Sequence, residues 1–143
     1  MAESVSKLLA DTYTLYLQTQ NFHWNVKGMN FSELHLLFES QYQELADAVD
    51  TIAERIRALA KMAPGTYKEF SQLSDITQVV GDIFAEKMIK HLVKCHQIIV
   101  ATAQMVCDNA EACHDQVSLD LATSRLAVHE KILWMLNSTI DGK

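Results

Sequence analysis

No proline or glycine interrupts the sequence between Ser32 and Leu59. Apolar residues recur along this stretch at the spacing of a helix, among them Leu34, Phe38 and Leu45. At 1.5 Å per residue, these roughly 30 residues form a rod on the order of 45 Å long. The whole chain has one proline and four glycines, too few for the frequent turns that an all-β fold needs. The sequence therefore predicts a fold in which helices dominate.

Three further helical segments accompany this one. Gly28 ends the first segment, Pro64 ends the second, and Ser32 is the expected N-cap of the second. A short helix is expected in the central crossover, and the expected long helices are Ser4 to Asn25, Ser32 to Leu59, Thr77 to Asn109 and Asp115 to Ile140, with Thr66 to Ser74 as the short one. Two long hairpins joined by a longer crossover predict one all-α domain, residues 1–143, folded as a ferritin-like four-helix bundle.

Charge and composition exclude several classes of protein. The 143 residues carry a formal charge of −6, and the scattered Lys and Arg residues give a nucleic acid little to bind. No apolar run approaches the length of a membrane span, and the start, MAESVSK, does not have the pattern of a secretory signal. An odd number of cysteines without a CxxC pair favours a reducing compartment: Cys95, Cys107 and Cys113. We expect a cytoplasmic protein without a membrane segment.

Two acidic residues, Asp50 and Glu54, are spaced four positions apart on the long second helix. Both carboxylates then project from one face, where they can share a metal ion. The alternative is an ordinary solvated face that interacts with Arg55 and Arg57. The pair alone does not decide between these interpretations.

Two histidines, His23 and His35, flank the turn that contains Gly28. The turn can bring both imidazoles to the same end of the first hairpin, and two adjacent imidazoles suit iron, zinc or copper. The alternative is two half-exposed histidines with unrelated hydrogen bonds.

The length of the second helix limits how these four residues can cooperate. His35 and Asp50 are fifteen residues apart on it, which corresponds to roughly 22 Å of helical rise. They cannot bind one metal ion within one chain. A site with both histidines and both acids therefore requires two antiparallel copies of the molecule, and a symmetric dimer would hold two such sites.

Several motifs together resemble the Dps family, the mini-ferritins named as DNA-binding proteins from starved cells. They are HWNVKGMNF, the histidine twelve residues after His23, DTIAER, TYKEFSQLSDI and HEKILWML. The resemblance covers essentially the whole chain. It implies four-helix subunits assembled into hollow homododecamers that oxidise Fe(II), preferentially with hydrogen peroxide, and store the ferric product inside.

The resemblance also implies roles for individual residues. His23 and His35 match the family's histidine ligands, and Asp50 and Glu54 match the carboxylate ligands of the facing subunit. Trp24 matches the tryptophan beside the site, where it could intercept a stray oxidising equivalent.

Other positions carry weaker implications. Glu39 stands where much of the family has aspartate, which makes it a candidate ligand for a second, weaker iron position. Asp115 and Asp120 fall where the family lines its pores with acids, and they are equally well explained as surface carboxylates. Zinc is a candidate competitor for the iron site.

The sequence also offers three other interpretations. Larger ferritins use two Glu-x-x-His motifs within one bundle, but this chain has only Glu111 to His114, in an expected loop. A zinc site formed by His91, Cys95 and His96 is disfavoured because adjacent residues of a helix face different directions. A non-enzymatic helical interaction or adhesion module would make the histidines and acids incidental.

The family's DNA-binding members commonly use flexible, lysine-rich tails. Here MAESVSK contains only Lys7, and the sequence closes with Asp141, Gly142 and Lys143. With a net negative charge in addition, we expect no DNA binding.

Overall fold

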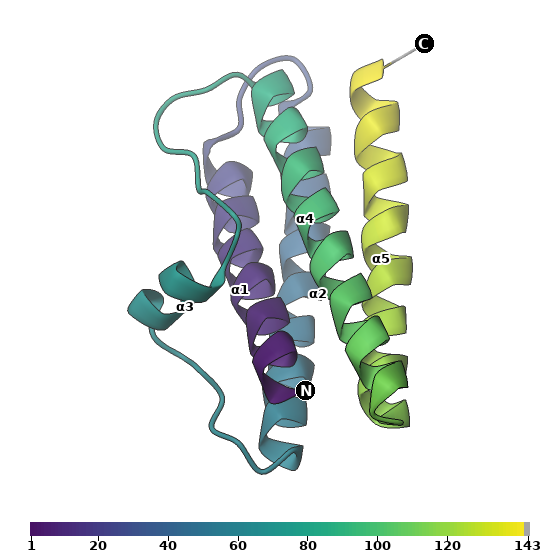
Figure 1. The fold of residues 1–143 in the computed structure, drawn as a ribbon. Helices are drawn as coiled ribbons and strands as arrows, with labels where there is room; N and C mark the ends of the chain where they lie inside the picture. Colours follow the sequence, from purple (N-terminus) through teal and green to yellow (C-terminus); the bar gives the residue numbers. More distant parts are fainter. Residues whose placement is uncertain (142–143) are drawn as a thin grey trace.

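The computed structural model describes residues 1–141, and within them the chain folds entirely into helices and connections. Figure 1 shows the long helices side by side and the short crossover helix on the outer side of the first. Gly142 and Lys143, part of the sequence end considered above, lie outside the described residues. The all-α ferritin-like bundle with a short crossover helix is confirmed, and the helices are α1 (Ala2–Asn25), α2 (Phe31–Ala58), α3 (Tyr67–Leu73), α4 (Ala85–Ala112) and α5 (Gln116–Asp141).

Each long helix buries an apolar stripe in one shared core. Such burial, more than intrinsic helix propensity, stabilises helices of this length. The α1–α2 and α4–α5 hairpins have the most extensive contacts, α1 also packs on α4, and α2 meets α5 only slightly. Large, fully buried side chains come from all four helices, including Leu8, Phe22, Phe38, Leu45, Ile52, Leu92, Ile99 and Leu136. Polar side chains therefore occupy the faces of these helices that point away from the core.

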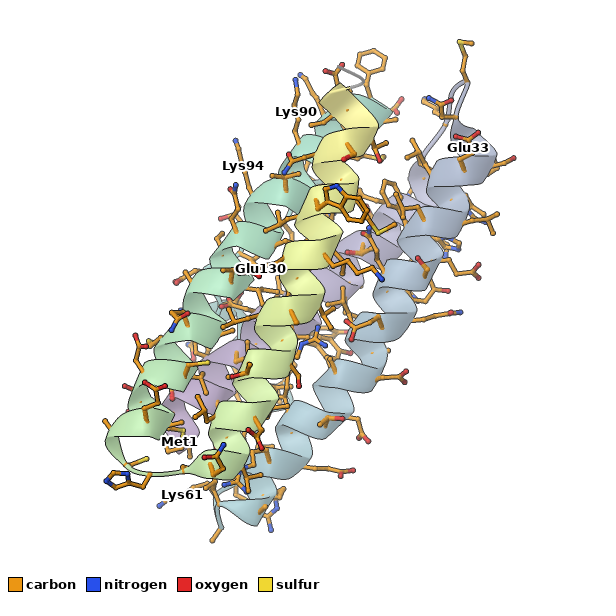
Figure 2. The ribbon with its side chains drawn as sticks, turned by 90° about the vertical axis from the view of Figure 1, so that its right-hand side faces the viewer. Met1, Glu33, Lys61, Lys90, Lys94 and Glu130 are labelled. Atoms are coloured by element: carbon orange, nitrogen blue, oxygen red, sulfur yellow. The ribbon has the colours of Figure 1, made fainter. Side chains whose placement is uncertain are left out.

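Most charged side chains lie on the outside of the bundle. Figure 2 shows Lys90 and Lys94 along α4 and Glu130 on α5, and all three are exposed. Among residues 1–141, no helix combines the length and the apolarity required to cross a membrane.

The turn between α1 and α2 differs in detail from the sequence prediction. Gly28 has a φ of 113°, a conformation that glycine adopts without steric cost. Its carbonyl accepts a hydrogen bond from the amide of Phe31 at 3.2 Å, which closes the turn early. Helix α2 therefore begins with Asn30 as its N-cap, and the prediction that Ser32 caps this helix is wrong.

The crossover contains the largest error in the predicted elements. The third long helix was expected from Thr77, but α4 begins at Ala85. The side chain of Gln18 replaces helical hydrogen bonds there, because it accepts from the Val79 amide at 2.6 Å and donates to the Val79 carbonyl at 3.3 Å. Gly81, with a φ of 98°, follows the segment that Gln18 holds by hydrogen bonds. The crossover thus lies against α1 in an irregular conformation.

A buried polar network lies between α2, α4 and α5. Arg125 binds the carboxylate of Glu44 with both terminal nitrogens, at 2.6 and 2.8 Å, and its Nη2 is also 2.9 Å from Nε2 of His129. A guanidinium only donates, so His129 must carry its proton on Nδ1 and donate it to Nδ1 of His96, 2.8 Å away. His96 then carries its proton on Nε2, which is buried and has no partner among the described residues.

Burial keeps both of these imidazoles neutral. Removal from water, with the nearby Arg125 charge, lowers the pKa of His96 to about 3. Removal from water, followed by the influences of His96 and Arg125, lowers the pKa of His129 well below its ordinary value. The interior of the bundle therefore contains two proton acceptors that the folded state prevents from charging.

Candidate metal centre

The two histidines of the first hairpin form a stacked pair. The ring centroids of His23 and His35 are 3.8 Å apart, and the ring planes differ by 14°. Nδ1 of His23 lies 2.7 Å from the backbone carbonyl of His35, and Nδ1 of His35 lies 2.7 Å from the carbonyl of His23. The prediction that the turn brings these rings together is confirmed.

This reciprocal arrangement determines the tautomer of both rings. A carbonyl oxygen only accepts, so each Nδ1 must be protonated, and in the neutral form of the ring the lone pair is then on Nε2. Histidines that bind metals commonly donate their second ring nitrogen to a carbonyl in this way. The pair therefore presents two oriented imidazoles, each with its Nε2 atom left to coordinate a cation.

Asp50 and Glu54 lie away from the histidine pair on the same chain. Both are exposed on α2, and the uninterrupted helix separates Asp50 from His35 by roughly 22 Å of rise. Figure 2 shows α2 spanning the bundle from Glu33 near one end toward Lys61 at the other. Across residues 1–141, no group of three or more His, Cys, Asp or Glu side chains could hold a metal ion. One chain therefore holds the histidine pair and the two acidic residues at separate places.

Glu39 and Trp24 are the two further candidate residues near the histidine pair: Trp24 directly follows His23, and Glu39 follows His35 by four residues. Glu39 follows His35 by one helical turn and is half-buried, so it shares a face of α2 with that ring. Trp24 is 60% exposed, and its indole lines a groove with Val79 and Gly81 of the crossover. Within residues 1–141 it stacks on neither imidazole.

Asp115 has a structural role in this subunit. Its carboxylate accepts from the Ser118 amide at 3.0 Å at the start of α5, and it pairs with Arg55 of α2 at 2.8 Å. Partial burial opposes ionisation, but hydrogen bonds from Ser118 and pairing with Arg55 hold the pKa of Asp115 below its ordinary value. Asp120 is exposed and accepts from Gln116. An acid-lined pore formed by Asp115 and Asp120 stays a prediction.

His91, Cys95 and His96 of α4 are not arranged as a zinc site. Sγ of Cys95 lies 3.4 Å from Nε2 of His91, whereas the neighbouring His96 turns to His129. Burial, reinforced by the charge of Asp11, raises the pKa of the Cys95 thiol to about 12. A thiol that resists ionisation is a poor metal ligand.

One aromatic neighbour of the centre was absent from the sequence prediction. The ring centroid of Tyr42 is 5.2 Å from that of His23, in an edge-on arrangement. Tyr42 follows His35 by seven residues, or two helical turns, so this spacing was the signal that could have identified it.

Known proteins resemble this chain along almost its whole length. A model of the ferritin-like domain matches residues 2–142. DNA protection during starvation protein 2 of Bacillus anthracis is 32% identical over 139 residues, which cover 97% of this chain and 95% of the relative. The chain belongs to the Dps family of ferritin-like proteins.

Two further relatives of this Dps-family chain span a range of similarity. An uncharacterised low temperature-induced protein of Nostoc is 36% identical over 137 residues, 94% of this chain and 76% of the relative. The crystal structure of a Dps protein from Vibrio cholerae superposes with a TM-score of 0.95 at 27% identity, over 98% of this chain and 88% of that one. Its description places the Vibrio protein among the ferritin-like diiron-carboxylate proteins.

Membership in this family makes the chain a mini-ferritin, an iron-storage protein in general terms. The candidate histidines and acids are of types that suit iron, because imidazoles and carboxylates are common iron ligands. Iron is in this setting the cargo that the protein stores.

Proposed function

We propose that this Dps-family protein is a ferroxidase that oxidises Fe(II), preferentially with hydrogen peroxide, and stores Fe(III) in a hollow homododecamer. Its role would be protection against oxidative stress. The observation that carries the proposal is the stacked pair of His23 and His35, whose Nδ1 protons are used by backbone carbonyls and whose Nε2 lone pairs remain.

The proposed centre is completed by a second subunit. An antiparallel dimer brings His23 and His35 of one subunit against the partner's Asp50 and the partner's Glu54. Such a site uses few protein ligands and leaves coordination positions for peroxide. Two Fe(II) ions supply the two electrons that one peroxide requires, and with two protons the products are two Fe(III) ions and two water molecules. Glu39 is a candidate ligand for the second iron, and zinc is a candidate competitor.

Exposed apolar side chains support a subunit contact at the histidine end. Met29 is fully exposed, Leu36 is 61% exposed, and Trp24 and Phe31 are also exposed around the same turn. Apolar groups gathered in this way are typical of surfaces that another protein covers. A cytoplasmic setting is consistent with the three free thiols.

A crystal soaked in Fe(II) tests the proposal directly. Twelve subunits of 16.1 kDa make a closed particle of about 190 kDa. We expect anomalous iron density between the histidine pair of one subunit and the partner's Asp50. Light scattering that reports a stable monomer, or iron density only at other places, would contradict the shared site.

DNA binding is expected to be absent. Twelve copies with a formal charge of −6 each sum to −72, and such a particle repels a polyanion at long range. We expect no gel shift of plasmid at physiological salt and neutral pH without added divalent cations. Any protection of DNA would then come from removal of iron and peroxide. Retention of plasmid under those conditions would show that a local basic patch overrides the net charge.

A further inference from the structure

A row of aromatic rings leads away from the histidine pair through the α1–α2 hairpin. The centroid of Tyr42 is 5.2 Å from that of His23, Tyr16 is 6.0 Å from Tyr42, and Tyr13 is 5.7 Å from Tyr16. Tyr42 belongs to α2, while Tyr16 and Tyr13 belong to α1. Three of the four tyrosines of the chain are therefore in near contact in one line.

The far end of this row differs from its beginning. Tyr13 stacks on Phe70 of α3, with centroids 4.9 Å apart and planes at 27°. It also lines a pocket of about 540 Å³ together with Thr14, Ser74 and Gln78. Phenylalanine is much harder to oxidise than tyrosine, and within residues 1–141 Tyr13 forms no ring pair with a tyrosine or tryptophan other than Tyr16, so the row of oxidisable rings ends at Tyr13. The row therefore ends at a site that small molecules can reach.

The surroundings of the three phenols allow oxidation. All three side chains are half-buried, and none of their hydroxyls is a buried group without a partner. Loss of an electron from a tyrosine is coupled to loss of the phenolic proton, so a hydroxyl with access to water can release that proton. Ring-to-ring contacts of this kind allow short electron transfers between neighbours.

We propose that Tyr42, Tyr16 and Tyr13 form an electron-transfer relay that supplies the second electron to peroxide when a centre holds only one Fe(II). The inference rests on the proposed ferroxidase function. In balanced form, Fe(II), hydrogen peroxide, one tyrosine and one proton give Fe(III), two water molecules and one neutral tyrosyl radical. The electron comes first from Tyr42, and transfer from Tyr16 and then Tyr13 moves the radical away from the iron.

Within one chain, Tyr42 rather than Trp24 is the oxidisable side chain in ring contact with the histidine pair. Tyr42 is in edge-on contact with His23, whereas Trp24 has no ring partner within residues 1–141 and its indole faces the groove beside the crossover. Its side chain is 60% exposed, so an oxidised Trp24 would place the radical at the surface. The tyrosine row instead leads through the hairpin.

Freeze-quench electron paramagnetic resonance tests the relay. The assembled protein receives one Fe(II) per centre and then peroxide, and wild type is expected to give a tyrosyl signal. Tyr42→Phe keeps the ring and removes the phenol, so the signal should fall several-fold while oxidation with two Fe(II) per centre stays unchanged. Tyr13→Phe should leave the radical on Tyr16 or Tyr42 and remove spin-trap adducts from the peptide that contains residue 13.

Tyr67→Phe is the matched control. Tyr67 lines the same pocket as Tyr13 and is 75% exposed, but it stacks on no other ring within residues 1–141. Its replacement should leave the signal at the wild-type level. An undiminished signal in Tyr42→Phe, or an equal loss in Tyr67→Phe, would overturn the relay. Wild type that oxidises Fe(II) without any tyrosyl signal would refute the relay alone, and wild type that oxidises no Fe(II) would refute the proposed function as well.

Discussion

Replacement of His35 by alanine should slow peroxide-driven Fe(II) oxidation by at least roughly 10- to 100-fold, the loss that even residues behind metal ligands typically cause. Asp50→Ala should have a similar effect, although Asp50 lies roughly 22 Å from His35 along α2. Both variants remove a proposed ligand without removing a core side chain, so the helical circular dichroism spectrum should persist. Stopped-flow absorbance measures the rates. Asp47→Ala, which removes an exposed acid one turn before Asp50, is the control and should match wild type.

Mixed assemblies of these two variants make the test specific for a shared site. A hybrid dimer of His35→Ala and Asp50→Ala contains one centre with both losses and one centre with neither. Random reassembly of equal amounts should therefore restore about a quarter of the centres, because half of the dimers are hybrids. Each variant reassembled with itself should restore none. Absence of recovery in the mixture, with hybrids verified by native mass spectrometry, would exclude ligands from two subunits.

Acid should destabilise the subunit through His96 and His129. Both residues have lowered pKa values in the folded state, so between their unfolded value near 6.5 and the folded values the unfolded chain binds more protons. Their contribution is complete above about pH 6.5 and is lost as the pH falls toward the folded pKa of His96, about 3. Each histidine can add up to about 1.4 kcal/mol of lost stability per pH unit.

Thermal melting of the iron-free protein from pH 7.5 to pH 4 tests this expectation. His129→Gln keeps an acceptor for Arg125 and a donor for His96 but cannot titrate, so its melting temperature should fall less steeply with acid. The control is His114→Asn, which changes an exposed histidine at a left-handed position that asparagine tolerates. Its pH dependence should follow wild type. Parallel slopes for all three proteins would contradict a role for the buried pair.

The arrangement of the long helices could be predicted from sequence because it depends on local patterns. Apolar periodicity identified α2 to within about two residues, which is the ordinary uncertainty of helix ends. The proximity of His23 and His35 also followed, since the turn between them is short. The separation of His35 from Asp50 needed only the rise of a helix.

Contacts between side chains that are far apart in the sequence could not be predicted from such patterns. The side chain of Gln18 holds Val79 in an irregular conformation, although the residues after Thr77 continue an acceptable helical pattern. The contact between His96 and His129 joins residues 33 positions apart, and neither their residue type nor their spacing predicts it. The ring row from Tyr42 to Tyr13 likewise depends on how α1 and α2 pack.

The uninterrupted course of α2 has a consequence for how this sequence can vary. In the proposed dimer, the helix fixes both the distance and the rotational phase between the histidine half and the acid half of two different centres. One inserted residue between His35 and Asp50 would rotate the acid pair by about 100° and shift it by about 1.5 Å. Insertions in the segment between α2 and α3 would leave that phase unchanged. Length variation among descendants of this chain should therefore concentrate in its connections and spare the interior of α2.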